Sequence, residues 1–389
     1  MHADNKKLKI VIIGAGIGGL SAAYCLSRYD FDVHVYERAK ELGEFGAGLQ
    51  IGPNSVKIFR AIDLECELRK CTFEPQTQLS IHGVDGSLRF REPMKGVMED
   101  KYDAPYLMAY RPDLHRLFYD RISADRIHLG KDCIGVDSFE DSATVTFSDG
   151  DQIRADIVIA ADGIKSVIRK QCFGTDKPEF TEMIAWRAIV PAAAVPRTTG
   201  PNNEVKIDEN DYFGWIGWNG HVVCYPIGDG SRVNIFAGHH SKDWIEESWS
   251  IPSTADEMIS AYAGWNASML KMFEHVTHCY KWGIFDRTPR LEWQRNTVIL
   301  LGDAAHPTMP TLAQGANMAI EDGYTIARCL EKHHDNPKTG LSEFVRLRQP
   351  RTARITLQAR QQFKNNLLRP PPPTIPRDWI FSFDATSGF

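Results

Sequence analysis

The sequence has no long apolar segment and no dense block of basic residues. A transmembrane helix needs about 18 consecutive apolar residues, so we expect none in this chain. The net charge is −5 and lysines and arginines are dispersed, so nothing indicates binding to nucleic acid or to an anionic membrane. The polar segment 1–7 leads directly into an apolar run, which leaves no room for a signal peptide.

The eight cysteines are scattered, and none forms a CxxC pair or lies in a histidine-rich segment. This distribution argues against a zinc site and is typical of reduced thiols in a cytoplasmic protein. We therefore expect a cytoplasmic location and no bound metal. The length of 389 residues exceeds one ordinary hydrophobic core and indicates two domains that share a cleft.

One stretch near the start of the chain carries the strongest signal. The nearly all-apolar run 8–13 predicts a buried parallel strand, segment 20–26 predicts a helix, and segment 31–36 predicts a second strand. The sequence G-x-G-x-x-G lies between the first strand and the helix, and Glu37 follows the second strand. Strand, glycine turn, helix, strand and acid in this order predict a dinucleotide-binding unit.

Each residue of this motif has an expected task. Gly14 permits the tight turn, Gly16 lets the backbone approach a pyrophosphate, and Gly19 lets helix and strand pack closely. The phosphates are expected at the helix N-terminus, where N–H groups and the helix dipole favour anions. Glu37 lies at about the 20-residue distance at which an acid accepts hydrogen bonds from ribose hydroxyls.

Two later apolar runs also end in an acid next to a glycine, at Asp162-Gly163 and at Gly302-Asp303. Because open α/β sheets bind ligands at the carboxyl ends of their parallel strands, we expect both acids near the dinucleotide. Segment 314–330 predicts a helix after the second of these acids. Its N-terminus could face an anionic or electron-rich ligand.

Other segments of the first domain give weaker signals. Segment 42–54 is rich in glycine, which indicates either backbone close to a ligand or a plain connector. Segment 55–70 predicts one helix, and segment 78–91 predicts a hairpin around an Asp-Gly turn. Arg111 precedes a helix that we expect to start at Asp113. There it could neutralise a phosphate, stack on a ring, or be an ordinary surface charge.

Residues 181–287 have a different composition, with short predicted strands, Asn-Gly and Asp-Gly turns, and seven of the nine tryptophans. Such a sheet could form a wall for a flat apolar ligand, or its core could simply be filled with aromatic side chains. Segment 340–366 then predicts an amphipathic helix that returns to the first domain. The proline run 370–373 predicts a stiff connector to an aromatic tail.

The three dispersed motifs together resemble the single-component FAD-dependent aromatic hydroxylases, the class A flavoprotein monooxygenases. The resemblance rests on GAGIGG with Glu37, on Asp162-Gly163, and on GDAAHP followed by AQGANMAIEDG. It implies an α/β fold, in which a Rossmann-like FAD-binding domain of the glutathione reductase type carries an inserted β-rich substrate domain like that of p-hydroxybenzoate hydroxylase. The implied parts are 1–176 and 286–366 for the FAD-binding domain, 75–100 for a hairpin on the substrate side, 177–285 for the substrate domain, and 367–389 for a tail.

The resemblance also assigns residues to the cofactor. Asp303 corresponds to the family acid that binds ribityl or ribose hydroxyls, Asp162 belongs to the motif associated with FAD and NAD(P)H, and Arg111 matches a family arginine near the flavin. The full set of expected FAD contacts comprises Gly14, Gly16, Gly19, Glu37, Arg38, Gly48, Arg111, Asp162, Gly163, Gly302, Asp303, Pro310, Gly315, Ala316 and Asn317.

Within the family, GAGLQIGPN, Trp186-Arg187, HVVCYP and WIFSFD are most similar to the salicylate and 3-hydroxybenzoate 6-hydroxylase branch. The 6-hydroxynicotinate hydroxylases are the next most similar. Gln50 stands where the hydroxynicotinate enzymes are expected to have histidine, which favours the first branch. Ala160-Ala161 replaces the Gly-Ala often found before Asp-Gly, and this small change leaves FAD binding expected.

The implied reaction is hydroxylation of a small hydroxyaromatic acid, with FAD as cofactor and NADH or NADPH and O2 as co-substrates. The oxygen would pass to the ring from a flavin C4a-hydroperoxide, while the protein places the ring and excludes water. A flavin oxidase or an NAD-dependent dehydrogenase would leave GDAAHP unexplained, and a flavin-binding scaffold would show no substrate-stimulated NAD(P)H oxidation. We expect a monomer or homodimer.

His221 and Tyr225 are the candidate catalytic and substrate-binding residues, in the sequence H-x-x-x-Y-P. In a strand, residues four apart face the same side, about 13 Å apart along the backbone. This spacing resembles the active-site strand of the hydroxybenzoate branch, although both could be ordinary sheet residues. His221, with an ordinary pKa of about 6.5, could accept a phenolic proton. Gln50 and Pro310 are expected to contact the substrate, and His306 to shape the flavin loop.

Overall fold

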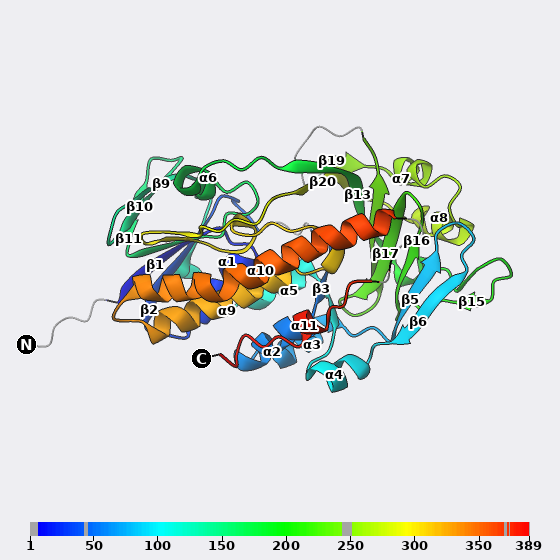
Figure 1. Cartoon of the computed structure of the whole chain (residues 1–389), viewed down its shortest axis with the longest axis horizontal. Coiled ribbons are helices and arrows are strands. Elements are labelled where there is room, and N and C mark those ends of the chain that lie inside the picture. Colours follow the sequence, from blue (N-terminus) through cyan, green and yellow to red (C-terminus); the bar gives the residue numbers. More distant parts are fainter. Residues whose placement is uncertain (1–6, 43–45, 243–250, 369–371, 373, 389) are drawn as a thin grey trace, which may run out of the picture.

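Two sheet-containing parts lie at opposite ends of the molecule, and the long helix α10 (Pro337–Leu367) runs between them (Figure 1). The tail that follows α10 folds back toward the middle of the molecule. Trp244 and Trp249, and most of the proline run 370–373, lie outside the part that the computed structural model describes. That part comprises residues 7–42, 46–242, 251–368, 372 and 374–388.

The first part is built on a sheet with the strand order β21-β22-β12-β1-β2-β8. All neighbours are parallel except the edge pair β21 and β22. The middle of the sheet is completely buried and covered on both faces, which explains why its strands are continuous apolar runs. The strands are β1 (Leu8–Ile13), β2 (Phe31–Glu37), β8 (Ile127–Leu129), β12 (Ile157–Ala160), β21 (Gln294–Arg295) and β22 (Val298–Leu300).

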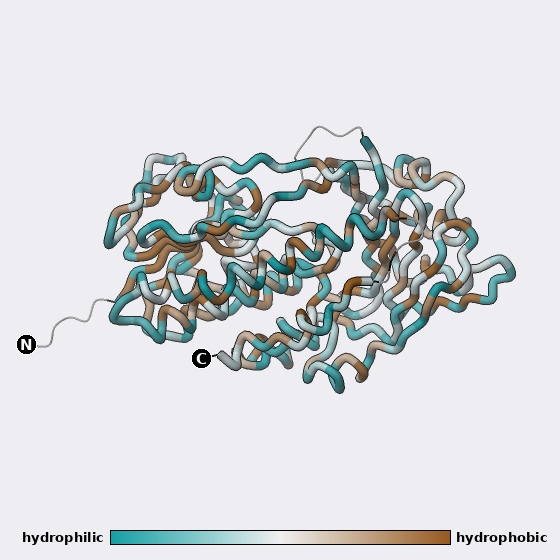
Figure 2. Tube along the Cα trace, viewed as in Figure 1, coloured by the Kyte–Doolittle hydropathy of each residue, from teal (hydrophilic) through white to brown (hydrophobic). Residues whose placement is uncertain are grey.

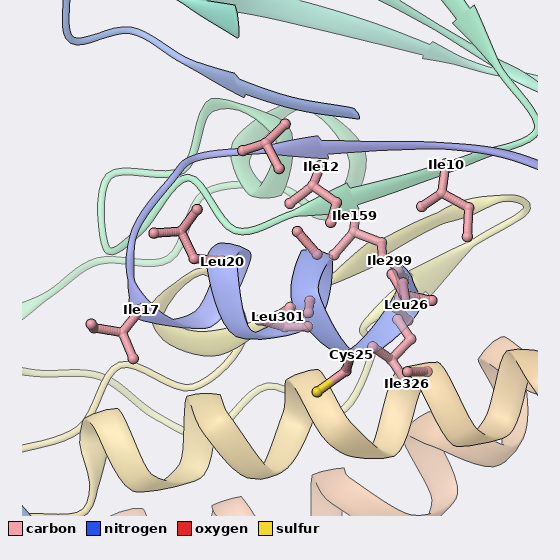
Figure 3. Packing of buried hydrophobic residues seen from close by; sticks show 14 of the residues in the cluster. Ile10, Ile12, Ile17, Leu20, Cys25, Leu26, Ile159, Ile299, Leu301 and Ile326 are labelled. Carbon is pink, nitrogen blue, oxygen red and sulfur yellow. The ribbon is translucent and has the colours of Figure 1, made fainter. Parts of the chain in front are cut away.

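Helix α1 (Ile17–Ser27) packs between this sheet and helix α9 (Gly315–Lys332). Figure 3 shows Leu26 of α1 near Ile326 of α9 and Ile299 of β22. The two helices approach closely because one of the facing residues is glycine: a Cβ at Gly323 would lie 2.3 Å from the hydroxyl oxygen of Ser21. Helix α9 therefore packs directly against α1, the helix that begins at the glycine turn.

Smaller elements surround the parallel sheet. In Figure 2 its strands are mostly apolar, whereas the outer loops are largely hydrophilic. Two three-stranded antiparallel sheets and short helices complete this part and its borders, while a two-stranded sheet lies beside β6 (Leu88–Pro93) in the second part (Figure 1). They are β9 (Cys133–Ser138), β10 (Ala143–Phe147) and β11 (Gln152–Ala155); β3 (Gly48–Ile51), β4 (Thr72–Phe73) and β7 (Leu107–Tyr110); β14 (Thr198–Thr199) and β15 (Val205–Lys206); and the helices α4 (Val97–Tyr102), α5 (Arg111–Tyr119) and α6 (Val167–Phe173).

Three local predictions need correction. The glycine-rich segment contains a strand, β3, which pairs with β7. The segment predicted as one helix forms two, α2 (Pro53–Ala61) and α3 (Glu65–Lys70), because the chain turns at Asp63, whose φ is 62°. Helix α5 begins at Arg111 rather than at Asp113, so Arg111 is part of the helix.

The second part is a mostly antiparallel sheet with the order β19-β20-β13-β18-β17-β16-β5-β6 in the described chain. The early hairpin β5–β6 joins it because β5 pairs in parallel with β16. The short helices α7 (Ala255–Ala261) and α8 (Ala267–Phe273) contribute to the core on one face. The strands are β5 (Thr77–His82), β6 (Leu88–Pro93), β13 (Glu179–Pro191), β16 (Tyr212–Ile216), β17 (Gly220–Ile227), β18 (Arg232–His240), β19 (Ile251–Ser253) and β20 (Cys279–Asp286).

The opposite face of this sheet packs against the first part. A separate apolar cluster joins Tyr225 and Trp282 of the sheet to Met309 and Met318 of the first part and to Phe381 of the tail. The tail segment contains the short helix α11 (Asp378–Phe381). No helix among the described residues is both long enough and apolar enough to cross a membrane.

A buried cluster of charges connects α9 to α10. Glu321 and Asp322 of α9 are completely buried, and Arg348 and Arg351 of α10 lie against them. Arg348 is 2.7 Å from an oxygen of each acid, and Arg351 donates two hydrogen bonds of 2.8 Å to Glu321. Burial opposes ionisation of Glu321 and Asp322, but the neighbouring cations outweigh it and lower both pKa values to about 2.

Replacement of Arg348 should destabilise the protein strongly. Arg348→Ala removes the cation that pairs with both buried carboxylates. We expect this loss to lower the free energy of unfolding by about 3–5 kcal/mol. Urea unfolding of the purified variant measures this loss. Arg346→Ala is the matched control on the same helix, because the Arg346 side chain is 69% exposed, and it should change stability by less than about 0.5 kcal/mol. Equal effects of the two substitutions would contradict the prediction.

Candidate active site

A cleft of about 350 Å³ opens at the carboxyl ends of β1 and β2. It is lined on one side by Ala15, Gly16 and Glu37, and on the other by Arg111 and His115 of α5. This is the edge of an open α/β sheet at which ligands are expected to bind. The first sequence motif and the arginine after β7 thus line one cleft.

The three motif glycines meet different local constraints. Gly14 has a φ of 104°, and a Cβ there would lie 2.4 Å from the carbonyl oxygen of Ala161. A Cβ at Gly19 would lie 2.0 Å from the carbonyl oxygen of Gly14, so both positions are closed by neighbouring protein. At Gly16, by contrast, no atom lies within 4 Å of such a Cβ. The open space therefore lies at the start of α1, where a pyrophosphate would be held.

Glu37 fastens the glycine turn. One carboxylate oxygen accepts the backbone N–H of Ala15 at 2.8 Å, and the other accepts that of Ala39 at 2.9 Å. His115 reinforces the turn from α5, because its Nε2 lies 2.7 Å from the carbonyl oxygen of Ala15 and must donate to it. Burial lowers the pKa of His115. His115 was not predicted as a site residue, although it lies four residues after Arg111, on the same helical face. The expected contact Arg38 is exposed beside Glu37.

Asp303 follows β22 and Arg111 follows β7, and their charges lie close enough to act on each other. Both side chains have accessible surface, yet desolvation by surrounding protein raises the pKa of Asp303 and lowers that of Arg111. The two charges also act on each other, each favouring the ionised form of its neighbour. A carboxylate with free surface in such a place can accept hydrogen bonds from ligand hydroxyls.

Asp162 and Arg169 position the neighbouring loops. An oxygen of Asp162 accepts the N–H of Val167 at 2.9 Å, at the start of α6, while its other oxygen is buried without a hydrogen-bond partner in the described structure. Burial raises the pKa of Asp162. Arg169 donates to the carbonyl oxygens of Asp303 and Ala304, at 3.3 and 3.2 Å. Arg169, to which the sequence analysis gave no role, therefore ties the loop after β12 to the loop after β22.

The GDAAHP loop is fixed to the charged cluster beneath it. Asp322 accepts the backbone N–H of Gly302 at 3.1 Å, and its same oxygen lies 2.5 Å from Nε2 of His306. His306 is buried and lies against Trp293, so the structure gives it the loop-shaping position that was expected. Pro310 follows as an exposed residue at the start of a short 3-10 turn.

Two of the expected FAD contacts use their polar groups inside the protein. The Asn317 side chain accepts the N–H of Gly52 and donates to the carbonyl oxygen of Gln50, both at 2.9 Å. Gly48 donates its N–H to the Asn234 side chain at 2.7 Å. Both residues thus fasten β3, and Gly48 joins it to the second sheet. Gly315 and Ala316 open α9 as expected, and Gly163 has a φ of 79°.

His221 and Tyr225 lie on the face of β17 that is turned toward the first part. The intervening Val222 and Cys224 belong to the core on the other face, whereas Tyr225 belongs to the cluster between the parts. The ring of His221 stacks on Phe236 with 5.5 Å between centroids. Burial lowers the pKa of His221 to about 4, so its ring is neutral at pH 7. The shared face predicted from the spacing is present.

Three tyrosines that lie far apart in the sequence surround Gln50. The Tyr106 hydroxyl donates to the Gln50 side chain at 2.7 Å, and the hydroxyls of Tyr212 and Tyr225 also reach it. Burial raises the pKa of all three tyrosines, so their hydroxyls stay protonated. Arg187 lies close by, with its guanidinium 4.2 Å from the centre of the Trp282 ring. No sequence spacing could bring these residues together, because they come from β3, β13, β16, β17 and the segment before β7.

Comparison with known proteins decides the family. A model described as "FAD binding domain" matches residues 7–359, most of the chain. The chain belongs to this family. It is an FAD-dependent monooxygenase of the aromatic hydroxylase class, as the sequence resemblance predicted.

Several characterised relatives cover nearly the whole chain at 32% identity. They are 3-amino-4-hydroxybenzoate 2-monooxygenase PtmB3 of Streptomyces platensis (99% of this chain and 98% of the relative), 6-hydroxynicotinate 3-monooxygenase of Bordetella bronchiseptica (97% and 96%), and 3-hydroxybenzoate 6-hydroxylase of Polaromonas naphthalenivorans (93% and 88%).

Solved structures agree with the fold. CtdE in complex with FAD and a substrate has a TM-score of 0.85 at 25% identity, covering 97% of this chain and 96% of that one. A salicylate hydroxylase substrate complex has a TM-score of 0.81 at 25% identity, covering 99% and 97%. The α/β architecture with a β-rich second part is thus that of the FAD-binding monooxygenases.

The residues of this monooxygenase fit FAD. A pyrophosphate could occupy the open space at Gly16, near the cation Arg111, and ligand hydroxyls could donate to the accessible Asp303 carboxylate. Hydrogen bonds from Ala15 to Glu37 and from Gly302 to Asp322 hold the turns that carry these groups. The Asp162 oxygen that lacks a partner lies in the loop next to Gly14. FAD, when bound, supplies the redox step and the activation of O2.

Loss of Asp303 should weaken FAD binding. Asp303→Ala removes an acceptor for ligand hydroxyls, which we expect to cost about 1.5–3 kcal/mol, or roughly 10- to 150-fold in Kd. Glu37→Ala should act in the same direction, because it also releases the glycine turn. Flavin content and FAD titration of the apoprotein measure both effects. Asp149→Ala, in an exposed turn bonded to Lys131, is the control. Wild-type affinity in both variants would contradict the assignment.

Proposed function

We propose that this monooxygenase hydroxylates a small hydroxyaromatic acid of the salicylate or hydroxybenzoate type, with NADH or NADPH as the reductant. The observation that carries the proposal is the juxtaposition of Tyr225 with Gln50 and Gly48, where β17 meets the FAD-binding part. A Cβ at Gly48 would lie 2.5 Å from the Tyr225 ring. The polar groups of the second sheet therefore lie directly against strand β3 of the first part.

The wall around these groups suits a flat ring. Trp282 and Met309 belong to the same apolar cluster as Tyr225, so the polar groups are set in apolar surroundings. The hydroxybenzoate relatives support a benzoate substrate. A hydroxypyridine carboxylate is the second candidate, favoured by the 6-hydroxynicotinate monooxygenase at the same identity.

The chain's own residues are suited to hold the ring rather than to carry protons over long distances. The Tyr225 hydroxyl stays protonated and can donate a hydrogen bond to one polar end of the substrate. His221, at the other end of the strand, is neutral and can accept a hydrogen bond from the substrate hydroxyl. With a pKa of about 4, His221 is a weak base. Its surroundings therefore favour a role in orienting the phenol over a role in accepting its proton.

A substrate panel tests the function directly. Salicylate and the hydroxybenzoates should stimulate NADH or NADPH oxidation by the holoenzyme and yield hydroxylated products, with hydroxypyridine carboxylates as the second group. Neutral polycyclic aromatics of similar solubility serve as the comparison. Stimulation by the polycyclic compounds alone would contradict the proposed substrate class, and absence of any stimulated oxidation would contradict hydroxylation.

Substitutions on β17 should separate NADH consumption from product formation. His221→Ala is expected to keep FAD bound but to divert most of the consumed NADH into hydrogen peroxide, because the ring is no longer oriented. Tyr225→Phe should act in the same direction, more weakly. Product formed per NADH consumed is the readout, and His240→Ala on the neighbouring strand is the control. If both variants keep wild-type coupling, these residues belong only to the sheet.

A further inference from the structure

The C-terminal tail docks on the tyrosine side of the site. Ile380 and Phe381 of α11 are buried, and the Phe381 ring packs edge-on against Tyr102 and Tyr106, with centroid distances of 5.5 and 5.6 Å. Asp378 adds an ion pair to Lys101 at 2.6 Å. The tail is thus fixed by an apolar anchor and an ion pair next to the residues that surround Gln50.

The arginines of the docked region differ in what they contact. Arg351 pairs with Glu321, and Arg354 stacks on Trp379 with its guanidinium 3.8 Å from the ring centre. Arg377 lies immediately before α11 and is partly exposed. Its guanidinium is 5.7 Å from the centre of the Phe381 ring and makes no hydrogen bond or ion pair in the described part of the chain.

Arg377 lies close to the tyrosines around Gln50. The Phe381 ring is near both Arg377 and Tyr106, and the Tyr106 hydroxyl donates to Gln50. The positive charge of Arg377 acts on the hydroxyls of both Tyr106 and Tyr212. Gln50 and Tyr212 keep accessible surface. A ligand at this point would meet neutral hydrogen-bond donors together with Arg377, whereas Arg187 acts on the group from the side of Tyr225.

We propose that Arg377 recognises the carboxylate of the aromatic substrate and that the docked tail thereby sets the preference for aromatic acids over neutral phenols. This inference rests on the proposed function. A guanidinium offers a planar pair of donors that matches a carboxylate, and the tyrosine hydroxyls can complete its hydrogen bonds. The ring hydroxyl would then point toward the His221 end of β17. Arg377 is a specificity-determining residue in this arrangement.

Binding of matched ligands to the holoenzyme tests the inference. Salicylate and salicylamide have the same ring and hydroxyl, but only salicylate carries a carboxylate, and the flavin absorbance change on titration gives Kd for each. Arg377→Gln should weaken salicylate binding about 10- to 100-fold and salicylamide binding less than about 2-fold. Arg377→Lys should restore part of the salicylate affinity. Arg354→Gln, which removes a charge beneath the same tail, should leave the ratio of the two affinities unchanged.

The outcomes distinguish this inference from the function on which it rests. Suppose that the wild-type enzyme binds and hydroxylates salicylate or another acid of the panel. If Arg377→Gln then weakens the binding of salicylate and salicylamide equally, or weakens neither, the role of Arg377 is disproved and the proposed function stands. If Arg354→Gln changes the ratio as much as Arg377→Gln does, loosening of the tail rather than direct recognition is responsible, and the inference is also disproved. If no aromatic acid binds or reacts with the wild-type enzyme, the proposed function itself is wrong.

Discussion

The buried charges between α9 and α10 are the constraint on which the site depends. Moving Glu321 and Asp322 out of water costs several kcal/mol for each ion, and the two arginines of α10 offset much of this cost together with hydrogen bonds from Asn54 and Gly302. Asp322 then uses its second oxygen to hold the N–H of Gly302 and the ring of His306. The backbone that presents Asp303 is therefore fixed by charges on a helix far along the chain. A neutral core of equal volume could stabilise the helices, but it could not hold this loop.

The same cluster connects the tail to the site. Arg351, bonded to Glu321, also donates to the carbonyl oxygen of Ile380 and lies 3.6 Å from the centre of the Phe383 ring. The cofactor loop and the docked tail thus share one helix as their support. Any change that shifts α10 would therefore affect both the loop that carries Asp303 and the segment that carries Arg377.

The sequence was most informative where a task depends on consecutive residues. The strand, glycine turn and acid around Glu37 were predicted because backbone geometry and distance along the chain determine them. The same holds for the shared face of His221 and Tyr225. Tertiary proximity was not accessible: nothing local indicates that Tyr106 meets Gln50, or that Arg169 spans two loops. Strand β3 was missed because its glycines resemble a connector, while its stability comes from pairing with β7.

Three arginines lie near enough to Asp303 to act on its charge. Arg187, Arg111 and Arg169 all act on Asp303, and Arg111 also acts on Arg187. Burial lowers the pKa of Arg187 to about 10, still well above neutrality, so its guanidinium group remains charged at pH 7. A nearby guanidinium favours the ionised form of an acid. If the substrate is the hydroxyaromatic acid proposed above, the arginines rather than His221, a weak base here, would favour the phenolate that electrophilic hydroxylation requires.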